Sequence, residues 1–183
     1  AIDISNFKKI NKIVEEFQPH YVINFAAETH VDNSISSSEE FIKSNYLGTY
    51  NLLRSSQNYY NNLTKKNKEK FIYFQVSTDE VFGYLKKNEK KFTELNQLKP
   101  SSPYSASKAG ADLLVKSWFL TYNLPIFISH CSNNYGPYQN KEKLIPKTIY
   151  NCINKKNIPI YGNGKQIREW IYVQDHVDAI LHI

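Results

Sequence analysis

Apolar positions along this 183-residue chain recur with two different periods, and the two kinds of block follow one another. Apolar residues at helical spacing predict amphipathic helices, whereas short continuous apolar runs predict strands. The expected helices cover residues 5–17, 38–61, 104–122, 144–153 and 175–183. The expected strands cover residues 21–27, 71–77, 125–131, 158–162 and 167–173.

This alternation of strands and helices predicts an α/β fold with a doubly wound, mostly parallel, Rossmann-like sheet. The run at 21–27 is continuously apolar, which is typical of a parallel strand covered on both faces. Ser5 or Asn6 is expected to cap the first helix. The polar stretches 62–70 and 83–103 are expected to be loops, and the second is expected to cover part of a ligand site.

Length and composition are those of an ordinary globular domain with a sizeable core, with 41% hydrophobic and 22% charged residues. The net charge of +6 suits an anionic small substrate at least as well as nucleic acid, for which no basic stripe or motif is present. The two cysteines have no metal-type spacing and form no disulfide framework, so reduced thiols in the cytoplasm are expected and no metal site is predicted. No apolar run is long enough for a membrane span, and the absence of methionine, also at position 1, predicts a fragment.

A tyrosine and a lysine stand four positions apart in the third expected helix. Tyr104 and Lys108 would therefore lie about one turn apart on the same helix face. An ammonium beside a phenol favours the phenolate, which lowers the pKa of the tyrosine and gives a base usable near neutral pH. Because the chain has 14 tyrosines, a surface tyrosine packed on a lysine stem is the alternative interpretation.

Hydroxyl and carboxyl side chains follow the strand expected at 71–77. Ser77 or Thr78 would offer a hydroxyl at the strand end, where doubly wound folds bind their ligands. Asp79 and Glu80 come next, and a neighbouring carboxylate raises the pKa of one member of such a pair, so that one can act as acid and the other as base. The alternative is an acidic pair that only stabilises a helix N-terminus.

Two further features allow a structural and a functional interpretation. Ala26 and Ala27 end their strand with small side chains, which permit either close approach of a ligand or close helix–strand packing. Asn45 interrupts the apolar stripe of its helix and needs hydrogen-bond partners if it is buried. Its structural role would be to tie that helix to the next strand, whereas the family resemblance described next implies that it supports the Tyr104–Lys108 pair.

These motifs resemble the extended short-chain dehydrogenase/reductases and, among them, the dTDP-glucose 4,6-dehydratases. The Thr-Asp-Glu triplet is the specific part, because related epimerases lack the acidic pair. The resemblance covers essentially the whole chain. The matching stretches are Phe25 to Asp32, Asn45 to Thr49, Ser77 to Gly83, Ser102 to Lys108, Cys131 to Tyr138, Glu142 to Pro146 and Pro159 to Tyr172.

The resemblance implies conversion of dTDP-glucose to dTDP-4-keto-6-deoxyglucose with tightly bound NAD, a hydro-lyase reaction of deoxysugar (rhamnose) biosynthesis. Tyr104 would take the proton from the hydroxyl on carbon 4, Lys108 would hold the ribose and lower the pKa of Tyr104, and Thr78 would bind the oxygen at carbon 4. Glu80 would remove the proton from carbon 5 while Asp79 protonates the departing hydroxyl at carbon 6. The implied catalytic set is Thr78, Asp79, Glu80, Tyr104 and Lys108.

The resemblance also implies the residues that contact the cofactor and the substrate, with Arg168 as a clamp for the diphosphate because its fork fits phosphate oxygens. An ion pair of Arg168 with Glu169 is the alternative. The implied cofactor contacts are Asp3, Ile4, Phe25, Ala26, Ala27, Glu28, Thr29, Ser44, Tyr104, Lys108 and Asn134. The implied substrate contacts are Thr29, Thr78, Asn133, Lys143, Leu144, Pro159, Ile160, Tyr161 and Arg168. Small departures from the family pattern are Thr29 for serine, Phe82 for tyrosine and Glu169 for aspartate.

One part of the family pattern is missing, since none of the six glycines forms the phosphate-binding fingerprint. The glycine-loop unit is therefore expected before Ala1, and the rest of a C-terminal substrate-binding part after Ile183. Residues 1–135 are predicted to belong to the NAD-binding domain, and residues 136–183 to begin an interleaved substrate-binding region. The fragment alone is expected to be inactive, and the whole protein to be a cytoplasmic homodimer.

Three alternatives stay open on the sequence alone. A UDP-glucose 4,6-dehydratase would share Thr78, Asp79 and Glu80. A UDP-sugar 4-epimerase would not need the acidic pair. A binding module without activity, for instance one that binds nucleic acid through its excess charge, would need neither that pair nor Tyr104 and Lys108.

Overall fold

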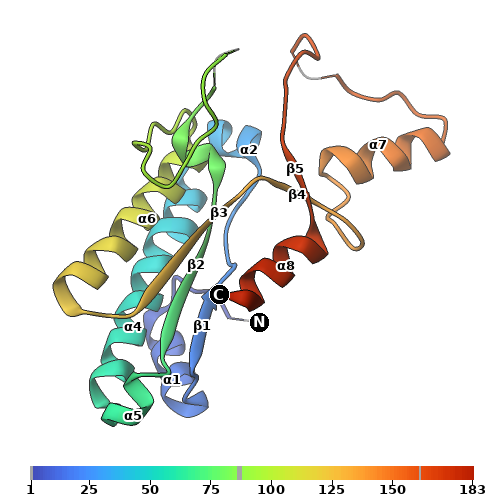
Figure 1. The fold of residues 1–183 in the computed structure, drawn as a ribbon. Coiled ribbons are helices and arrows are strands. Elements are labelled where there is room, and N and C mark those ends of the chain that lie inside the picture. The colour runs from blue at the N-terminus through green and yellow to red at the C-terminus, as the bar shows by residue number, and fades with distance from the viewer. Residues whose placement is uncertain (1, 86–87, 161) are drawn as a thin grey trace. The chain divides into compact units, whose positions relative to one another are not determined.

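The computed structural model describes residues 2–85, 88–160 and 162–183 (Figure 1). Its internal contacts divide the chain into two units, residues 1–130 and residues 131–183, which are described separately. The first unit contains the helices α1 (Phe7–Phe17), α2 (Val31–Ser36), α3 (Glu39–Phe41), η1 (Ile42–Leu47), α4 (Gly48–Asn62), α5 (Lys65–Lys68), η2 (Asp79–Phe82) and α6 (Pro103–Tyr122). The second contains α7 (Leu144–Ile153) and α8 (Val173–His182).

The sheet of the first unit consists of β1 (Tyr21–Asn24), β2 (Ile72–Thr78) and β3 (Ile126–Cys131) in that spatial order. β1 and β2 are parallel, with Tyr21 opposite Ile72 and Asn24 opposite Gln75, and all three arrows point the same way in Figure 1. Helical segments connect each strand to the next. The predicted α/β fold with a mostly parallel, Rossmann-like sheet is therefore confirmed.

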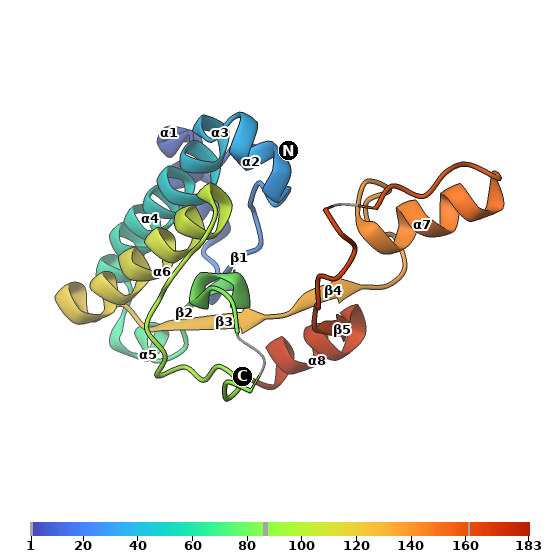
Figure 2. The ribbon, with the colours of Figure 1, turned by 90° about the horizontal axis from the view of Figure 1, so that it is seen from above.

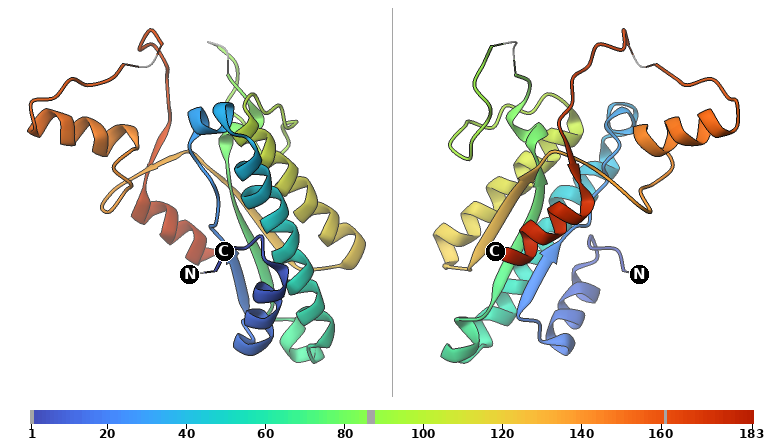
Figure 3. Two further views of the ribbon diagram at one scale, coloured as in Figure 1. Left: turned by 180° about the vertical axis from the view of Figure 1, so that it is seen from behind. Right: turned by 45° about the vertical axis from the view of Figure 1, so that its right-hand side comes forward.

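Helices α1, α4 and α6 pack on one face of this sheet (Figures 2 and 3). The core between them is apolar and lies deep under α4. Its buried members are Ile10, Val14, Leu52, Leu53, Phe71, Tyr73, Val115 and Leu124. Only β2 is covered along most of its length, whereas Tyr21 and Ile23 of β1 are 62% and 42% exposed. The prediction that the 21–27 strand is covered on both faces is wrong for the described residues.

The first helix begins where its capping residue places it. The Asn6 side chain accepts a hydrogen bond of 3.2 Å from the backbone N–H of Lys9, so Asn6 and not Ser5 is the cap. Gln18 ends the helix in the left-handed conformation. The helix expected at 38–61 is instead three segments, because a π-helical turn, η1, separates α3 from α4. Such π turns are frequent at functional sites, and this one contains Asn45.

Several predicted boundaries were wrong. β1 ends at Asn24 and not at residue 27, and the stretch 62–70, expected as a loop, contains α5. Helix α2 and the short 3₁₀ helix η2 lie where no helix was expected. Within the described part of 158–162 no strand forms, and the strand expected at 167–173 shrinks to β5 (Trp170–Tyr172). β5 pairs in parallel with β4 (Asn133–Tyr135).

No helix in the described part of the chain is long and apolar enough to cross a membrane.

Candidate active site

The segment after β2 carries the hydroxyl and the two carboxyls. Thr78 is buried at the strand end, and its Oγ1 accepts a 3.3 Å hydrogen bond from the backbone N–H of Glu80 and donates one of 3.4 Å to Asp79 Oδ1. Asp79 and Glu80 are half-buried in the first turn of η2. They are thus an acidic pair at the N-terminus of a helix. Because η2 has only four residues, its summed peptide dipole is small and stabilises the two carboxylates little.

Gly83 ends η2 in a conformation that only glycine adopts easily, with φ of 89°. A Cβ at this position would lie 2.5 Å from the carbonyl oxygen of Lys99, so the chain passes too close for a side chain. The backbone N–H of Lys99 in turn donates to the carbonyl of Val81 at 2.9 Å. The acidic segment, residues 78–82, is therefore held at its end by the backbone of Lys99.

The tyrosine and the lysine lie in the first turns of α6. Ser102 caps this helix in a reciprocal capping box with Ser105, and Pro103 occupies its first turn. Tyr104 is 8% and Lys108 is 4% exposed, which excludes the alternative of a surface tyrosine on a lysine stem. Lys108 Nζ donates a 2.8 Å hydrogen bond to the backbone carbonyl of Val76, two residues before Thr78.

This hydrogen bond places the two motifs side by side. Helix α6 packs against both β2 and η2, and Lys108 reaches the strand that leads into the acidic segment. Lys108 remains one turn from Tyr104 on the same helix. The structure therefore brings the hydroxyl, the carboxyl pair and the tyrosine–lysine pair to one end of the first unit.

Asn45 connects this region to the loop after β1. Its side-chain oxygen accepts from the N–H of Glu28 at 2.8 Å, and its amide donates to the carbonyl of Glu28 at 2.9 Å and to Ser107 Oγ at 2.9 Å. The hydroxyl of Ser107 donates to the Tyr104 carbonyl at 2.7 Å. Asn45 is 1% exposed, and its partners support the second of the two interpretations, in which it holds the tyrosine–lysine helix.

The loop at 25–29, which Asn45 holds through Glu28, is otherwise accessible to solvent. Phe25 is 58% exposed, Ala26, Glu28 and Thr29 are exposed, and the N–H of Ala26 is held by the Asn24 side chain at 3.1 Å. Small side chains on a fixed, accessible backbone suit a ligand more than helix packing.

A buried polar network lies behind this loop, and the sequence analysis missed it. The Asn24 amide donates to Thr49 Oγ1 at 3.1 Å and to Gln75 Oε1 at 3.0 Å. The Tyr73 hydroxyl donates to the same oxygen of Gln75 at 3.0 Å, and burial raises the pKa of Tyr73, which keeps this hydroxyl a donor. The only signal in the sequence is that polar residues occupy otherwise apolar strands.

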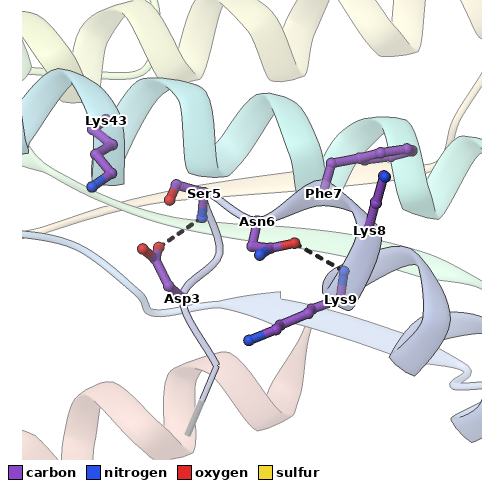
Figure 4. A pocket seen from close by; sticks show the side chains of 7 residues that line it. All are labelled: Asp3, Ser5, Asn6, Phe7, Lys8, Lys9 and Lys43. Carbon is purple, nitrogen blue, oxygen red and sulfur yellow. Dashed lines mark hydrogen bonds between the residues drawn. The ribbon is translucent and has the colours of Figure 1, made fainter.

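A pocket opens at the start of the chain, between the first turn of α1 and η1 (Figure 4). It is lined by Asp3, Ser5, Asn6, Phe7, Lys8, Lys9 and Lys43. Asp3 accepts a 2.8 Å hydrogen bond from the backbone N–H of Ser5, and this bond holds the pKa of Asp3 below its usual value. Of the predicted cofactor contacts, Asp3 lines the pocket. Ile4 and Ser44 are half-buried and directly adjoin lining residues in the sequence.

The remaining predicted site residues lie in the second unit. Asn134 Oδ1 bonds His176 Nδ1 at 2.8 Å, and the Asn133 side chain donates to the Glu169 carbonyl at 3.2 Å. Lys143 occupies the N-cap position of α7 without a side-chain capping bond, and Arg168 is exposed. Leu144, Pro159 and Ile160 are also exposed, and Tyr161 lies outside the described residues. The roles given to all these residues stay predictions, as does their convergence with Thr78 and Tyr104.

The parallel sheet and its flanking helices define a Rossmann-like α/β protein. Over residues 1–183 the chain matches the family model described as GDP-mannose 4,6 dehydratase, and it belongs to that family.

Named relatives narrow the comparison. The chain is 49% identical over 178 residues to a dTDP-glucose 4,6-dehydratase of Haemophilus influenzae, covering 97% of this chain and 53% of the relative. It is similar to the structure of a dTDP-glucose 4,6-dehydratase from Streptomyces venezuelae solved with NAD, with 37% identity, a TM-score of 0.88, and coverage of 98% and 52% of the two chains. A third similar structure, from Bacillus anthracis and also with NAD, has 40% identity, a TM-score of 0.82 and the same coverage. The chain thus spans about half the length of the relatives it matches.

Proposed function

We propose that the full-length protein is an NAD-dependent dTDP-glucose 4,6-dehydratase. The observation that carries this proposal is the placement of Tyr104, Lys108 and the Asp79–Glu80 pair at one end of a single parallel sheet. The tyrosine–lysine pair suits oxidation of an alcohol. The acidic pair suits loss of water, which neither a simple epimerase nor a reductase requires.

The residues of the first unit fit NAD. Asp3 offers a carboxylate and Lys43 an ammonium at the pocket of Figure 4, which suit the polar edge of an adenosine. The loop at 25–29 offers an accessible backbone, and Lys108 offers donors for ribose hydroxyls. NAD, when bound, supplies the acceptor for the hydride of carbon 4 and the donor that later reduces carbon 6.

The first step is removal of a proton from the sugar. Tyr104, in its phenolate form, takes the proton of the carbon-4 hydroxyl while the hydride leaves carbon 4, so that a ketone forms. Thr78 donates a hydrogen bond to the oxygen at carbon 4. Lys108 is held by the Val76 carbonyl, and its positive charge favours the phenolate.

Elimination of water follows because the ketone acidifies carbon 5. Glu80, as carboxylate, accepts the proton from carbon 5, and Asp79, as carboxylic acid, protonates the hydroxyl that leaves carbon 6. The two side chains are adjacent and half-buried, so their unlike protonation is favoured by mutual repulsion of two charges. Hydride return to carbon 6 and a proton to carbon 5 complete the product, and carbon 4 is oxidised as carbon 6 is reduced, so no external oxidant is consumed.

In this proposal the second unit supplies contacts to the nucleotide-sugar substrate and one contact to the cofactor. Asn133 would contact the sugar, Asn134 the cofactor, and Arg168 the diphosphate. The exposure of Arg168 leaves its guanidinium accessible to a ligand. The further proposed contacts of this unit are Lys143, Leu144, Pro159, Ile160 and Tyr161, and Thr29 of the first unit is also proposed to contact the substrate. We also propose that the whole protein is a cytoplasmic homodimer, which analytical ultracentrifugation would test.

The function is tested by incubating the full-length protein separately with dTDP-glucose and UDP-glucose and identifying the products by mass spectrometry and NMR. We expect a dTDP-linked 4-keto-6-deoxy sugar, formed with loss of one water. Faster reaction of UDP-glucose would show that the enzyme prefers uracil to thymine in the nucleotide of its substrate. A product epimerised at carbon 4 without loss of water would replace the dehydratase by an epimerase, and no conversion would favour a binding module.

A further inference from the structure

A buried cluster of three polar side chains lies beside the acidic segment, outside the proposed catalytic set. Ser77 Oγ donates a 2.8 Å hydrogen bond to Asp112 Oδ2, and His130 Nε2 lies 3.0 Å from the same oxygen. Asp112 is fully buried, Ser77 is 3% exposed, and the His130 side chain is 14% exposed. With Asp112 as the acceptor of both bonds, His130 presents an Nε2–H to it.

The geometry excludes a nucleophilic triad. In such a triad the histidine accepts the proton of the serine and the carboxylate holds the far nitrogen of the ring. Here the carboxylate lies in the middle, and the Ser77 hydroxyl points at Asp112 and not at His130. The cluster therefore holds elements together instead of activating a nucleophile.

The three residues come from three different elements and meet at one carboxylate. Ser77 lies in β2, His130 in β3, and Asp112 lies on α6 four positions after Lys108. Residues at this spacing lie on the same face of a helix. Asp112 thus fixes the helix that carries the tyrosine–lysine pair to the two strands beside it.

Both ends of the acidic segment rest on this cluster. Ser77 directly precedes Thr78 at the beginning of the segment. At its other end, the Phe82 ring packs on the His130 ring with centroids 4.8 Å apart and an angle of 54° between their planes. Asp79 and Glu80 lie between these two supports.

From this arrangement we propose that Asp112 and His130 are positioning residues that hold Asp79 and Glu80 in register with Tyr104 and Lys108. The proposal rests on the proposed dehydratase function. Loss of this support displaces the two carboxyls relative to carbons 5 and 6 of the sugar. Oxidation at carbon 4 depends mainly on Tyr104 and Lys108 of α6, with Thr78 as a hydrogen-bond donor, and is affected less.

The kinetic test uses the full-length enzyme and compares two steps in the same sample. His130→Phe keeps a ring against Phe82 but cannot donate to Asp112, whereas His130→Gln restores a donor. We expect His130→Phe to slow water elimination about tenfold to 100-fold relative to carbon-4 oxidation, the range that small misplacements cause, with KM nearly unchanged. His130→Gln should recover much of the ratio. If His130 only stabilised the fold, its loss would reduce the folded fraction and lower the rates of both steps by the same factor. The ratio of the two rates would then be unchanged.

A second measurement does not need activity. We expect hydrogen exchange of the backbone amides of Gly83 and Lys99, which are bonded to the acidic segment, to be several-fold faster in His130→Phe. Amides of β1 serve as the control and should be unchanged. If His130→Phe does not fold, Ser77→Ala, which removes one hydroxyl, replaces it in both measurements.

The outcomes separate the two proposals. An unchanged ratio of the two steps, or equal exchange at Gly83 and Lys99 in variant and wild type, would overturn the positioning role. If the wild-type enzyme does not dehydrate dTDP-glucose, the proposed function fails, and the exchange measurement alone still decides whether His130 supports the acidic segment.

Discussion

The side-chain amide of Asn45 donates a 2.9 Å hydrogen bond to the hydroxyl of Ser107, although 62 positions separate the two residues in the sequence. That hydroxyl donates in turn to the carbonyl of Tyr104. The same asparagine is bonded through its oxygen and its amide to the backbone of Glu28. One side chain thus fixes the distance between the open loop after β1 and the helix that carries the proposed base.

Replacing Asn45 by alanine should therefore affect both stability and turnover. The variant removes the partner of the part-buried backbone groups of Glu28 and of the buried Ser107 hydroxyl, which costs about 1–3 kcal/mol. We expect chemical denaturation of the full-length protein to show this loss, together with reduced turnover. Asn58→Ala is the matched control because Asn58 is exposed on α4, and it should change neither quantity. Equal stability of the two variants would contradict the bridging role.

A histidine in the second unit predicts a dependence of stability on pH. His176 is 8% exposed, and burial lowers its pKa below the ordinary value of 6.5. Its Nδ1 bonds Asn134 Oδ1 at 2.8 Å, while its buried Nε2 has no hydrogen-bond partner among the described residues. Protonation of Nε2 would therefore bury an unpaired charge.

The sign follows from proton binding. Below about pH 6.5 the unfolded chain binds a proton at His176 before the folded chain does, so this site destabilises the fold as the pH falls toward its lower folded pKa. Above that pH the site contributes no dependence. We expect an NMR titration to give His176 a pKa below 6.5, and His176→Gln to flatten the stability profile in this range. A His176 pKa at or above 6.5 would refute the prediction.

Periodicity predicted the helices well because burial of one face determines them locally. The helix expected at 144–153 is α7 itself, and the one expected at 104–122 differs from α6 only by Pro103. Strand ends were less predictable. β1 stops at Asn24 because its side chain turns to bond Ala26, and the run at 158–162 finds no partner strand among the described residues.

Some residues of the candidate site could be predicted from the sequence, and others could not. Tyr104 and Lys108 were found because one helical turn connects them in sequence as well as in space. The residues that support them, such as Asn24, Asp112 and His130, come from distant segments and meet only through the tertiary fold. No local pattern marks such residues, so only the structure reveals them.

Removal of the Tyr104 hydroxyl tests the proposed base directly. Tyr104→Phe keeps the ring and its edge-to-face contact with Phe41, whose centroid lies 6.3 Å away, so the fold should persist. We expect turnover of dTDP-glucose to fall by about 100-fold or more, the low end of general-base contributions. Tyr122→Phe at the exposed end of the same helix is the control. Near-normal turnover of Tyr104→Phe, with a circular dichroism spectrum like that of the wild type, would remove Tyr104 from the mechanism.

The acidic pair separates loss of water from oxidation. Asp79→Asn keeps the size of the side chain but cannot donate a carboxylic proton, and Glu80→Gln cannot accept one. Each substitution should slow water elimination by about 100-fold or more, while carbon-4 oxidation still occurs because Tyr104 and Lys108 are intact.

Isotope exchange distinguishes the two members of the pair. In deuterated water, Glu80→Gln should strongly suppress exchange at carbon 5, because no carboxylate remains to remove that proton, although the absorbance of reduced NAD still rises when substrate is added. Asp79→Asn should permit exchange at carbon 5 but block departure of the hydroxyl from carbon 6. If both variants eliminate water at the wild-type rate, Asp79 and Glu80 only stabilise the start of η2, and the dehydratase mechanism fails with them.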